Sequence, residues 1–208
     1  MITPDARCSA AALGQIAGLS SQSGYQFEEV DLADQGRFFL VSAPVSHDDL
    51  LAAVRRSVEA GQIDRTWLGW KEQAWVSVAV RLDEELKTGR MYTFLPMEHA
   101  ASAFHGHLNA PFYTKLARRD VSEEVHLNAF LLDCVADLCV ETMMRVAHSN
   151  HDFAPVVVLD LLCWDTSHVE LLHKTFLRYG RAIHQAEVVP VITAGGAQAW
   201  ASLENTCA

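Results

Sequence analysis

Two histidines separated by one glycine lie in the middle of the chain, in the stretch FHGHLNAPFYTKLARRD at residues 104–120. His105 and His107 could ligate zinc or copper, with His99 nearby. Residues two apart on a strand share one face, so the same pair also fits an ordinary polar face. The candidates for further ligands are Cys134, Cys139 and His126, which fall on a predicted helix. The two cysteines belong to the apolar stripe of that helix. The sequence gives a metal centre little support, and we predict none.

Three cations follow the histidines and stand just ahead of a predicted helix: Lys115, Arg118 and Arg119. Helix N-termini favour anions, and the planar guanidinium of arginine matches phosphate oxygens. Cations placed there oppose the helix dipole unless something negative arrives. The alternative is a solvated basic turn, paired weakly at the surface with acidic neighbours: Asp120, Glu123 and Glu124. Both interpretations stay open from spacing alone.

Other catalytic motifs are absent from the sequence. There is no G-x-S-x-G elbow, no G-x-x-x-x-G-K-[ST] loop and no G-x-G-x-x-G turn. The five cysteines are an odd number with no close CxxC pair, so neither a disulfide framework nor a zinc knuckle is indicated. We interpret Cys134, Cys139 and Cys163 as small buried hydrophobes. The chain carries no nucleotide cradle of its own.

Composition narrows the class of protein. The formal net charge of −10 argues against a nucleic-acid partner, because phosphate backbones are bound by clustered lysine and arginine. No apolar run approaches the roughly 20 residues needed to cross a bilayer, so we expect no membrane partner. The start, MITPDARCSAAALGQ, lacks the features of a secretory signal. We therefore expect a cytoplasmic location.

The first half of the chain predicts strands around one helix. Residues 25–32 and 36–45 are predicted strands, separated by a turn-like cluster at 33–36. Ser46 is expected to cap a helix that closes at Gly61 and buries one apolar stripe: Leu50, Leu51, Val54 and Val58. A hairpin of two strands, 75–82 and 90–97, is expected next, and then a strand at 107–114.

The second half predicts long helices and further strands. The longest helix is expected to begin at Asp120 or Ser122, with Asp120 and Glu123 as a capping box. Its buried positions step by three, four and seven: Val125, Leu132, Val135, Cys139, Met143 and Val146. The apolar run 154–164 predicts a buried strand, 167–185 a helix, and 187–196 a strand and turn.

This order predicts an α+β or α/β chain in which helices pack on a mixed β-sheet. Residues 1–24 are small and polar, and we expect a flexible lead-in or a short helix there. Residues 25–187 are expected to form a single domain. Residues 188–208 are expected to begin a following section, because WASLENTCA looks like an interrupted continuation.

The segment GRMYTFLPMEHAASAFHGHLNAPFYTKLARRDVSEEVHLNAFLLDCVADL resembles the region after the ATP-binding domain in sacsin-like proteins. These are GHKL ATPases, relatives of the ninety-kilodalton heat-shock chaperone. The family pattern has a strand ending in FLP, an HxNAxF-like strand, an Arg-containing loop and a helix with an early Asn. Here these elements are Phe94-Leu95-Pro96, His107 to Phe112, Arg118-Arg119 and Asn128. The match covers about residues 75–135, with a weaker one at 188–205.

The resemblance implies a role within a larger ATPase. ATP and Mg are expected upstream, on an E-x-x-x-N helix and a D-x-G-x-G loop that this chain lacks. The middle domain of the chaperone relatives supplies a basic side chain to the γ-phosphate. Arg119 or Arg118 would be that residue here, with Lys115 beside it and Asn109 on the cofactor side. The expected partner is the upstream ATP-binding domain, and the isolated chain is expected to be inactive.

Two other classes of function stay open. The chain could be a stand-alone adaptor that binds a client or partner protein without nucleotide chemistry. The tryptophans of TWLGWKEQAW, which are Trp67, Trp70 and Trp75, would then be a candidate contact patch, although aromatics beside a hairpin also suit a core. A small metal-dependent enzyme built on His105 and His107 is the third class.

Overall fold

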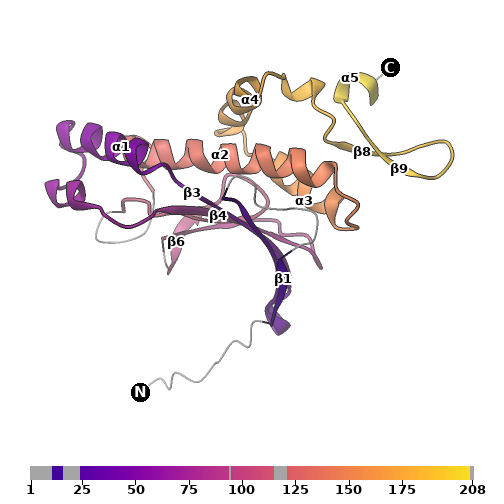
Figure 1. Ribbon diagram of the computed structural model, residues 1–208, viewed down its shortest axis with the longest axis horizontal. Helices are drawn as coiled ribbons and strands as arrows, with labels where there is room; N and C mark the ends of the chain where they lie inside the picture. The colour runs from indigo at the N-terminus through magenta and orange to yellow at the C-terminus, as the bar shows by residue number, and fades with distance from the viewer. Residues whose placement is uncertain (1–10, 16–23, 94, 115–120, 207–208) are drawn as a thin grey trace.

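The computed structural model describes residues 11–15, 24–93, 95–114 and 121–206. Its body is a seven-stranded mixed β-sheet with helices laid on one face, which confirms the α+β fold class (Figure 1). The strand order is β1-β2-β3-β4-β7-β5-β6, and only β5 and β7 pair in parallel. The strands are β1 (Ala11–Gln15), β2 (Gln26–Asp31), β3 (Arg37–Pro44), β4 (Trp75–Arg81), β5 (Arg90–Thr93), β6 (Leu95–Ala101) and β7 (His107–Asn109).

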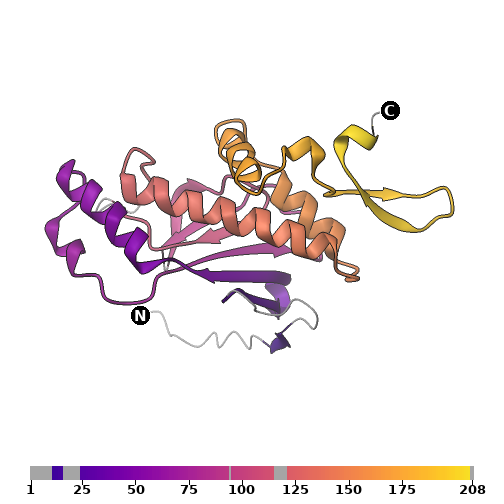
Figure 2. The same cartoon turned by 45° about the horizontal axis from the view of Figure 1, so that its top comes forward.

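The helical layer is centred on α2, which runs along the sheet (Figure 2). Helices α1 and α3 pack against α2 and lie on the same side of the sheet, and α4 also packs against α2. The helices are α1 (His47–Glu59), α2 (His126–Ala147), α3 (Ala154–Leu162) and α4 (Val169–Arg178), with short 3₁₀ helices η1 (Ala33–Gln35), η2 (Arg65–Gly69) and η3 (Ile183–Gln185). In the described ranges, no helix has the length and apolar character needed to span a membrane.

The core lies between the sheet and these helices. Residues alternate in and out along β3 and β4, so that one face of each strand is buried: Phe39, Val41, Ala43, Val76, Val78 and Val80. All six residues predicted for the stripe of the longest helix are buried against this face. Ser46 caps α1 as predicted, because its Oγ accepts the Asp49 N–H at 3.4 Å. Within the predicted α1 stripe, Leu50 and Val54 are buried, whereas Leu51 and Val58 are half-buried.

The predicted hairpin between residues 75–82 and 90–97 is wrong. Strand β7 inserts between β4 and β5, and β5 pairs with β6 and β7. The chain can fold back this way because Gly89 approaches Gly106 very closely. A Cβ on Gly89 would lie 1.8 Å from the Gly106 carbonyl oxygen, so no side chain fits there. The resulting crossover separates strands that the sequence places side by side.

Residues 154–162 form helix α3, which corrects the predicted strand at 154–164. Pro155 lies in the first turn, where the missing N–H costs no helical hydrogen bond. Burial follows a helical period, since Ala154, Val157, Val158 and Leu161 are buried while Val156 and Leu159 are exposed. A short apolar run does not distinguish a buried strand from a buried helix. The helix predicted for 167–185 is also shorter, because α4 ends at Arg178 and Gly180 takes a φ of +75°.

Both ends of the described chain add small elements. Residues 11–15 form β1 and pair with β2, in place of the lead-in or short helix that we expected. Near the C-terminus, β8 (Val189–Ile192) and β9 (Gln198–Ala201) form a separate two-stranded sheet, followed by α5 (Leu203–Thr206). This hairpin projects beyond the end of the main sheet (Figure 2). The predicted strand and turn at 187–196 are confirmed as β8 and the turn after it.

Candidate functional site

The predicted phosphate-binding cations Lys115, Arg118 and Arg119 lie outside the described residues. The structure describes both flanks of their segment. On the N-terminal side the chain leaves β7 and continues through Pro111 to Thr114, and on the C-terminal side it resumes at Val121 ahead of α2. The candidate site is therefore described through these two flanks and the residues that hydrogen-bond to them.

Asn128 joins the two flanks. It lies in the first turn of α2 and is completely buried. Its Oδ1 accepts the Tyr113 N–H at 2.8 Å, and its Nδ2 donates to the Tyr113 and Ser122 carbonyl oxygens, both at 2.9 Å. The chain on either side of the basic segment is thus bonded to one amide group. A buried amide whose donors and acceptor are satisfied fixes local geometry strongly.

The start of α2 is held by α1 instead of by its own capping residue. Helix α2 begins at His126, after Val125, so the predicted start at Asp120 or Ser122 is wrong. Asp120 of the predicted capping box lies outside the described residues. The Oγ of buried Ser57 accepts the Leu127 N–H at 2.8 Å, and Oε1 of Gln62 accepts the His126 N–H at 3.0 Å. These contacts satisfy N-terminal helix donors that would otherwise be orphaned.

Gln62 also holds the turn before α2, since its Nε2 donates to the Glu124 carbonyl oxygen at 2.7 Å. The Ser57 hydroxyl in turn donates to the Ala53 carbonyl oxygen at 3.0 Å. The last turn of α1 and the residues after it therefore make a fixed base for the flank. The sequence carries one signal for this contact, because Ser57 is a polar residue at a helical spacing from Leu50, Ala53 and Val54 in the buried stripe.

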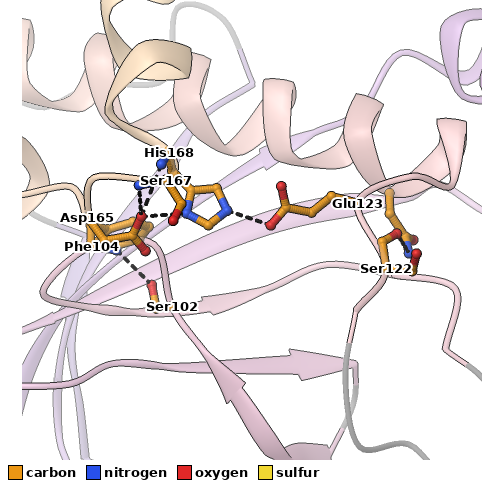
Figure 3. A network of polar contacts seen from close by, with 8 residues as sticks. Ser102, Phe104, Ser122, Glu123, Asp165, Ser167 and His168 are labelled. Atoms are coloured by element: carbon orange, nitrogen blue, oxygen red, sulfur yellow. Dashed lines mark hydrogen bonds and ion pairs between the residues drawn. The ribbon is translucent and has the colours of Figure 1, made fainter.

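A second brace comes from the loop ahead of α4, where His168 reaches Glu123 (Figure 3). The His168 Nε2 lies 2.5 Å from Glu123 Oε1, and its Nδ1 lies 2.8 Å from Asp165 Oδ1. Asp165 Oδ1 also accepts the Ser167 and His168 N–H groups at 2.9 and 3.0 Å. Partial burial alone would lower the pKa of His168, but the two carboxylates raise it above its ordinary value.

The paired histidines of the FHGH stretch point to different surroundings. His105 lies 4.0 Å from Asp160 of α3, measured from Nδ1 to Oδ1. His107 lies in β7, where its ring packs against Phe38 and Tyr92. In the part of the chain that the structure describes, no group of three or more His, Cys, Asp or Glu is arranged to hold a metal ion. Asn109, the predicted cofactor-side residue, is exposed on β7 and faces the open side of the sheet.

The tryptophans of residues 66–75 form a hollowed aromatic surface beside the N-terminal flank. Trp67 and Trp70 stack at 5.6 Å between ring centroids, and Trp67 meets the Tyr113 ring edge-on at 5.6 Å. Both indoles are half-buried. Cavities of about 250, 260 and 170 Å³ adjoin Trp70, and Trp75 lines the smallest. Thr114, the last described residue before the basic segment, lines one of the larger two.

Comparison with known proteins adds no assignment, because no family model, no curated protein and no solved structure matches this chain.

Proposed function

We propose that this chain is the middle-type domain of a longer ATPase of the sacsin-like GHKL class. It would supply a basic loop to the γ-phosphate of ATP that is held, with Mg, by an upstream domain of the same cytoplasmic protein. Arg119 or Arg118 would stabilise the transferring charge, Lys115 would add to the positive field, and Asn109 would lie on the cofactor side. The domain would perform no catalysis by itself.

The observation that carries this proposal is the attachment of both flanks of the basic segment to Asn128. A side chain that stabilises transition-state charge must be positioned before the reaction, since reorganisation during the reaction costs rate. Tyr113 and Ser122 are bonded to the same buried amide. The segment between them, which carries the three cations, therefore leaves from and returns to one rigid point.

The braces around Asn128 support the relay of nucleotide state. Ser57 and Gln62 connect the flank to α1, and His168 connects it to the loop ahead of α4. If the basic loop moved toward a phosphate, these contacts would transmit the displacement to α1 and α4. Such coupling needs a contiguous set of packed and hydrogen-bonded groups, and these residues supply one.

The test is ATP turnover and ATP binding, measured separately. The purified 208-residue chain is expected to show no stoichiometric ATP hydrolysis, and the native protein in source cells is expected to be far larger than 23.0 kDa by immunoblot. In the full-length protein, the double variant Arg118→Ala/Arg119→Ala should bind ATP normally and turn it over slowly. The matched control is Arg55→Ala/Arg56→Ala, which removes two exposed arginines of α1.

Two results would reject the proposal. One is stoichiometric hydrolysis by the isolated chain, and the other is normal turnover by the full-length Arg118→Ala/Arg119→Ala variant. A native product of about 23.0 kDa would also remove the ATPase assignment.

The second candidate function is a protein-binding adaptor, favoured by the hollowed surface around Trp70. Tryptophan is enriched at the energetic centres of protein interfaces, and cavities beside it can receive a partner's side chains. Exposed Leu95 lines one of these cavities, and exposed Leu68 follows Trp67 in the same 3₁₀ helix. Trp70→Ala should then abolish partner binding while Trp75→Ala affects it less, whereas under the ATPase proposal the basic residues dominate the phenotype.

A further inference from the structure

A cavity of about 270 Å³ lies on the sheet face that the helices leave open. Asn109 lines it and is also the residue placed on the cofactor side in the proposed ATPase role, which otherwise does not involve this cavity. Its lining is mainly apolar, and it includes Val30 and Leu32 from β2 and the residue after it, with Phe38 and Leu40 from β3. The residues of its lining that carry polar groups come from η1, β4, β5 and β7: Gln35, Ser77, Tyr92, His107 and Asn109.

The hollow results from side-chain size along the sheet. Ser77 and Ala79 of β4 form its floor on the open face. Leu40 pairs with Ala79 on one side, and His107 pairs with Ala79 on the other. Small side chains on the central strand between larger ones on its neighbours leave a trough. The Ser77 hydroxyl is already satisfied, since its Oγ lies 2.7 Å from the Ser42 Oγ.

A backbone hydrogen bond sets the tautomer of the neutral His107 ring at the wall of this cavity. Its Nδ1 accepts the Arg90 backbone N–H at 3.1 Å, so the neutral ring carries its proton on Nε2. Burial lowers the pKa of His107, and the nearby Arg90 and Arg81 cations lower it further. The edge of the ring against Tyr92 fixes its orientation, with centroids 5.6 Å apart. His107 can therefore donate one hydrogen bond from Nε2.

A cation stands next to this histidine. Arg90 is the first residue of β5 and precedes Met91, which pairs with Leu108 of β7. Because side chains alternate along a strand, Arg90 lies on the same open face as Tyr92. Arg81 and Arg37 are engaged by carboxylates: Asp83, Glu84 and Glu29. Within the described residues Arg90 forms no ion pair, and it is exposed. Its guanidinium can receive an anion at the rim of an apolar hollow.

We propose that this cavity binds a small amphipathic carboxylate. The apolar body lies over Ser77 and Ala79, between the β3 side chains and the rings of Tyr92 and His107. The carboxylate meets Arg90 and accepts a hydrogen bond from Nε2 of His107. Since a water molecule occupies about 30 Å³ of liquid, a 270 Å³ space suits a ligand of on the order of ten heavy atoms. The match of charge and shape favours a monocarboxylate over a neutral or cationic ligand.

The test compares 3-phenylpropionate with 3-phenylpropan-1-ol, which share an apolar body and differ in charge. Both are titrated into the 208-residue chain, with amide chemical shifts as the readout. The carboxylate should bind saturably at one site, with the largest shifts at Ser77, Ala79 and Asn109. Arg90→Ala should weaken the carboxylate about tenfold and leave the weaker binding of the alcohol unchanged, because an ion pair of this kind contributes about a factor of ten.

Two further variants complete the design. Arg55→Ala removes an exposed arginine on α1 and should change neither affinity. Ala79→Leu fills the floor of the trough from the open face and should abolish binding of both compounds. The inference is overturned by no saturable binding at millimolar concentration, by an equal effect of Arg90→Ala on both compounds, or by shifts confined to the Trp67 and Trp70 region. A concentration-dependent dimer that covers Ser77 and Ala79 would also overturn it, because a second copy would then be the occupant.

Discussion

Asn128 and Tyr113 form a reciprocal pair, in which Tyr113 donates its N–H to Oδ1 and accepts from Nδ2 through its carbonyl oxygen. Asn128 lies in helix α2, whereas Tyr113 lies in the segment after β7, 15 residues earlier in the chain. The side-chain amide of Asn128 thus gives Tyr113 the two backbone hydrogen bonds that a neighbouring strand would give it within a sheet. This pair makes the flank of the basic segment part of the folded core, and it gives the first prediction.

Asn128→Leu should lower the free energy of unfolding by about 3 kcal/mol, because it leaves a buried N–H and two carbonyl groups without partners. Urea denaturation followed by circular dichroism measures the change. Asn150→Leu makes the same substitution at an exposed site and should change the midpoint little. Equal midpoints for the two variants would show that the Asn128 bonds contribute nothing.

The raised pKa of Asp160 should make the free energy of unfolding fall as pH rises. Burial raises its pKa to about 6, and Glu85 adds to this while His105 opposes it. A folded-state pKa above the unfolded value favours folding fully below pH 4, and this contribution is lost as pH rises through about 6. Asp160→Asn should therefore stabilise the protein by on the order of 2 kcal/mol at pH 8 and little at pH 4.

Thermal unfolding of Asp160→Asn and wild type at pH 4 and pH 8 measures this difference. Asp152→Asn changes an exposed aspartate close in sequence, and it should show no such pH dependence. If Asp160→Asn gives the same shift in Tm at both pH values, then ionisation of Asp160 does not carry the effect.

The pKa of His168 is also raised, but here the folded state favours the charged form of the side chain. Its carboxylate partners favour the imidazolium, so their contribution is fully present below the unfolded pKa near 6.5 and is lost as pH rises through the folded value. His168→Ala should cost about 1 kcal/mol more at pH 5.5 than at pH 9. His173→Ala, an exposed histidine on α4, is the matched control. An NMR titration midpoint for His168 at or below 6.5 would contradict this assignment.

We expect the thiols of Cys134, Cys139 and Cys163 to differ in reactivity, because they differ in exposure. Burial raises the pKa of Cys134 to about 12 and raises that of fully buried Cys139 even further, and burial also raises the pKa of exposed Cys163. Thiolates are the reacting species, so access and pKa together decide the rate. In a Cys8→Ser/Cys207→Ser variant, we expect a disulfide reagent to titrate one thiol slowly in the native protein. The other two should react only in denaturant, and three fast native thiols would reject the prediction.

Local patterns determined the elements whose signals are periodic or chemically specific. The alternation of β3 and β4, the Ser46 cap of α1 and the buried stripe of α2 were all predictable, because each depends on neighbours within one or two turns. The two histidines were identified as a pair, but their different surroundings were not predictable. The basic residues were identified as a cluster, and their role stays a prediction.

Only the tertiary structure decided which elements meet. The insertion of β7 between β4 and β5 depends on the contact of Gly89 with Gly106, whose pairing no local pattern encodes. The start of α2 is set by Ser57 and Gln62, far away in the chain, and the helical state of residues 154–162 by packing on α2. The open-face cavity needs side chains from separate strands in register. Local sequence acts over a few residues, whereas these features depend on long-range contacts that exist only once the chain has folded.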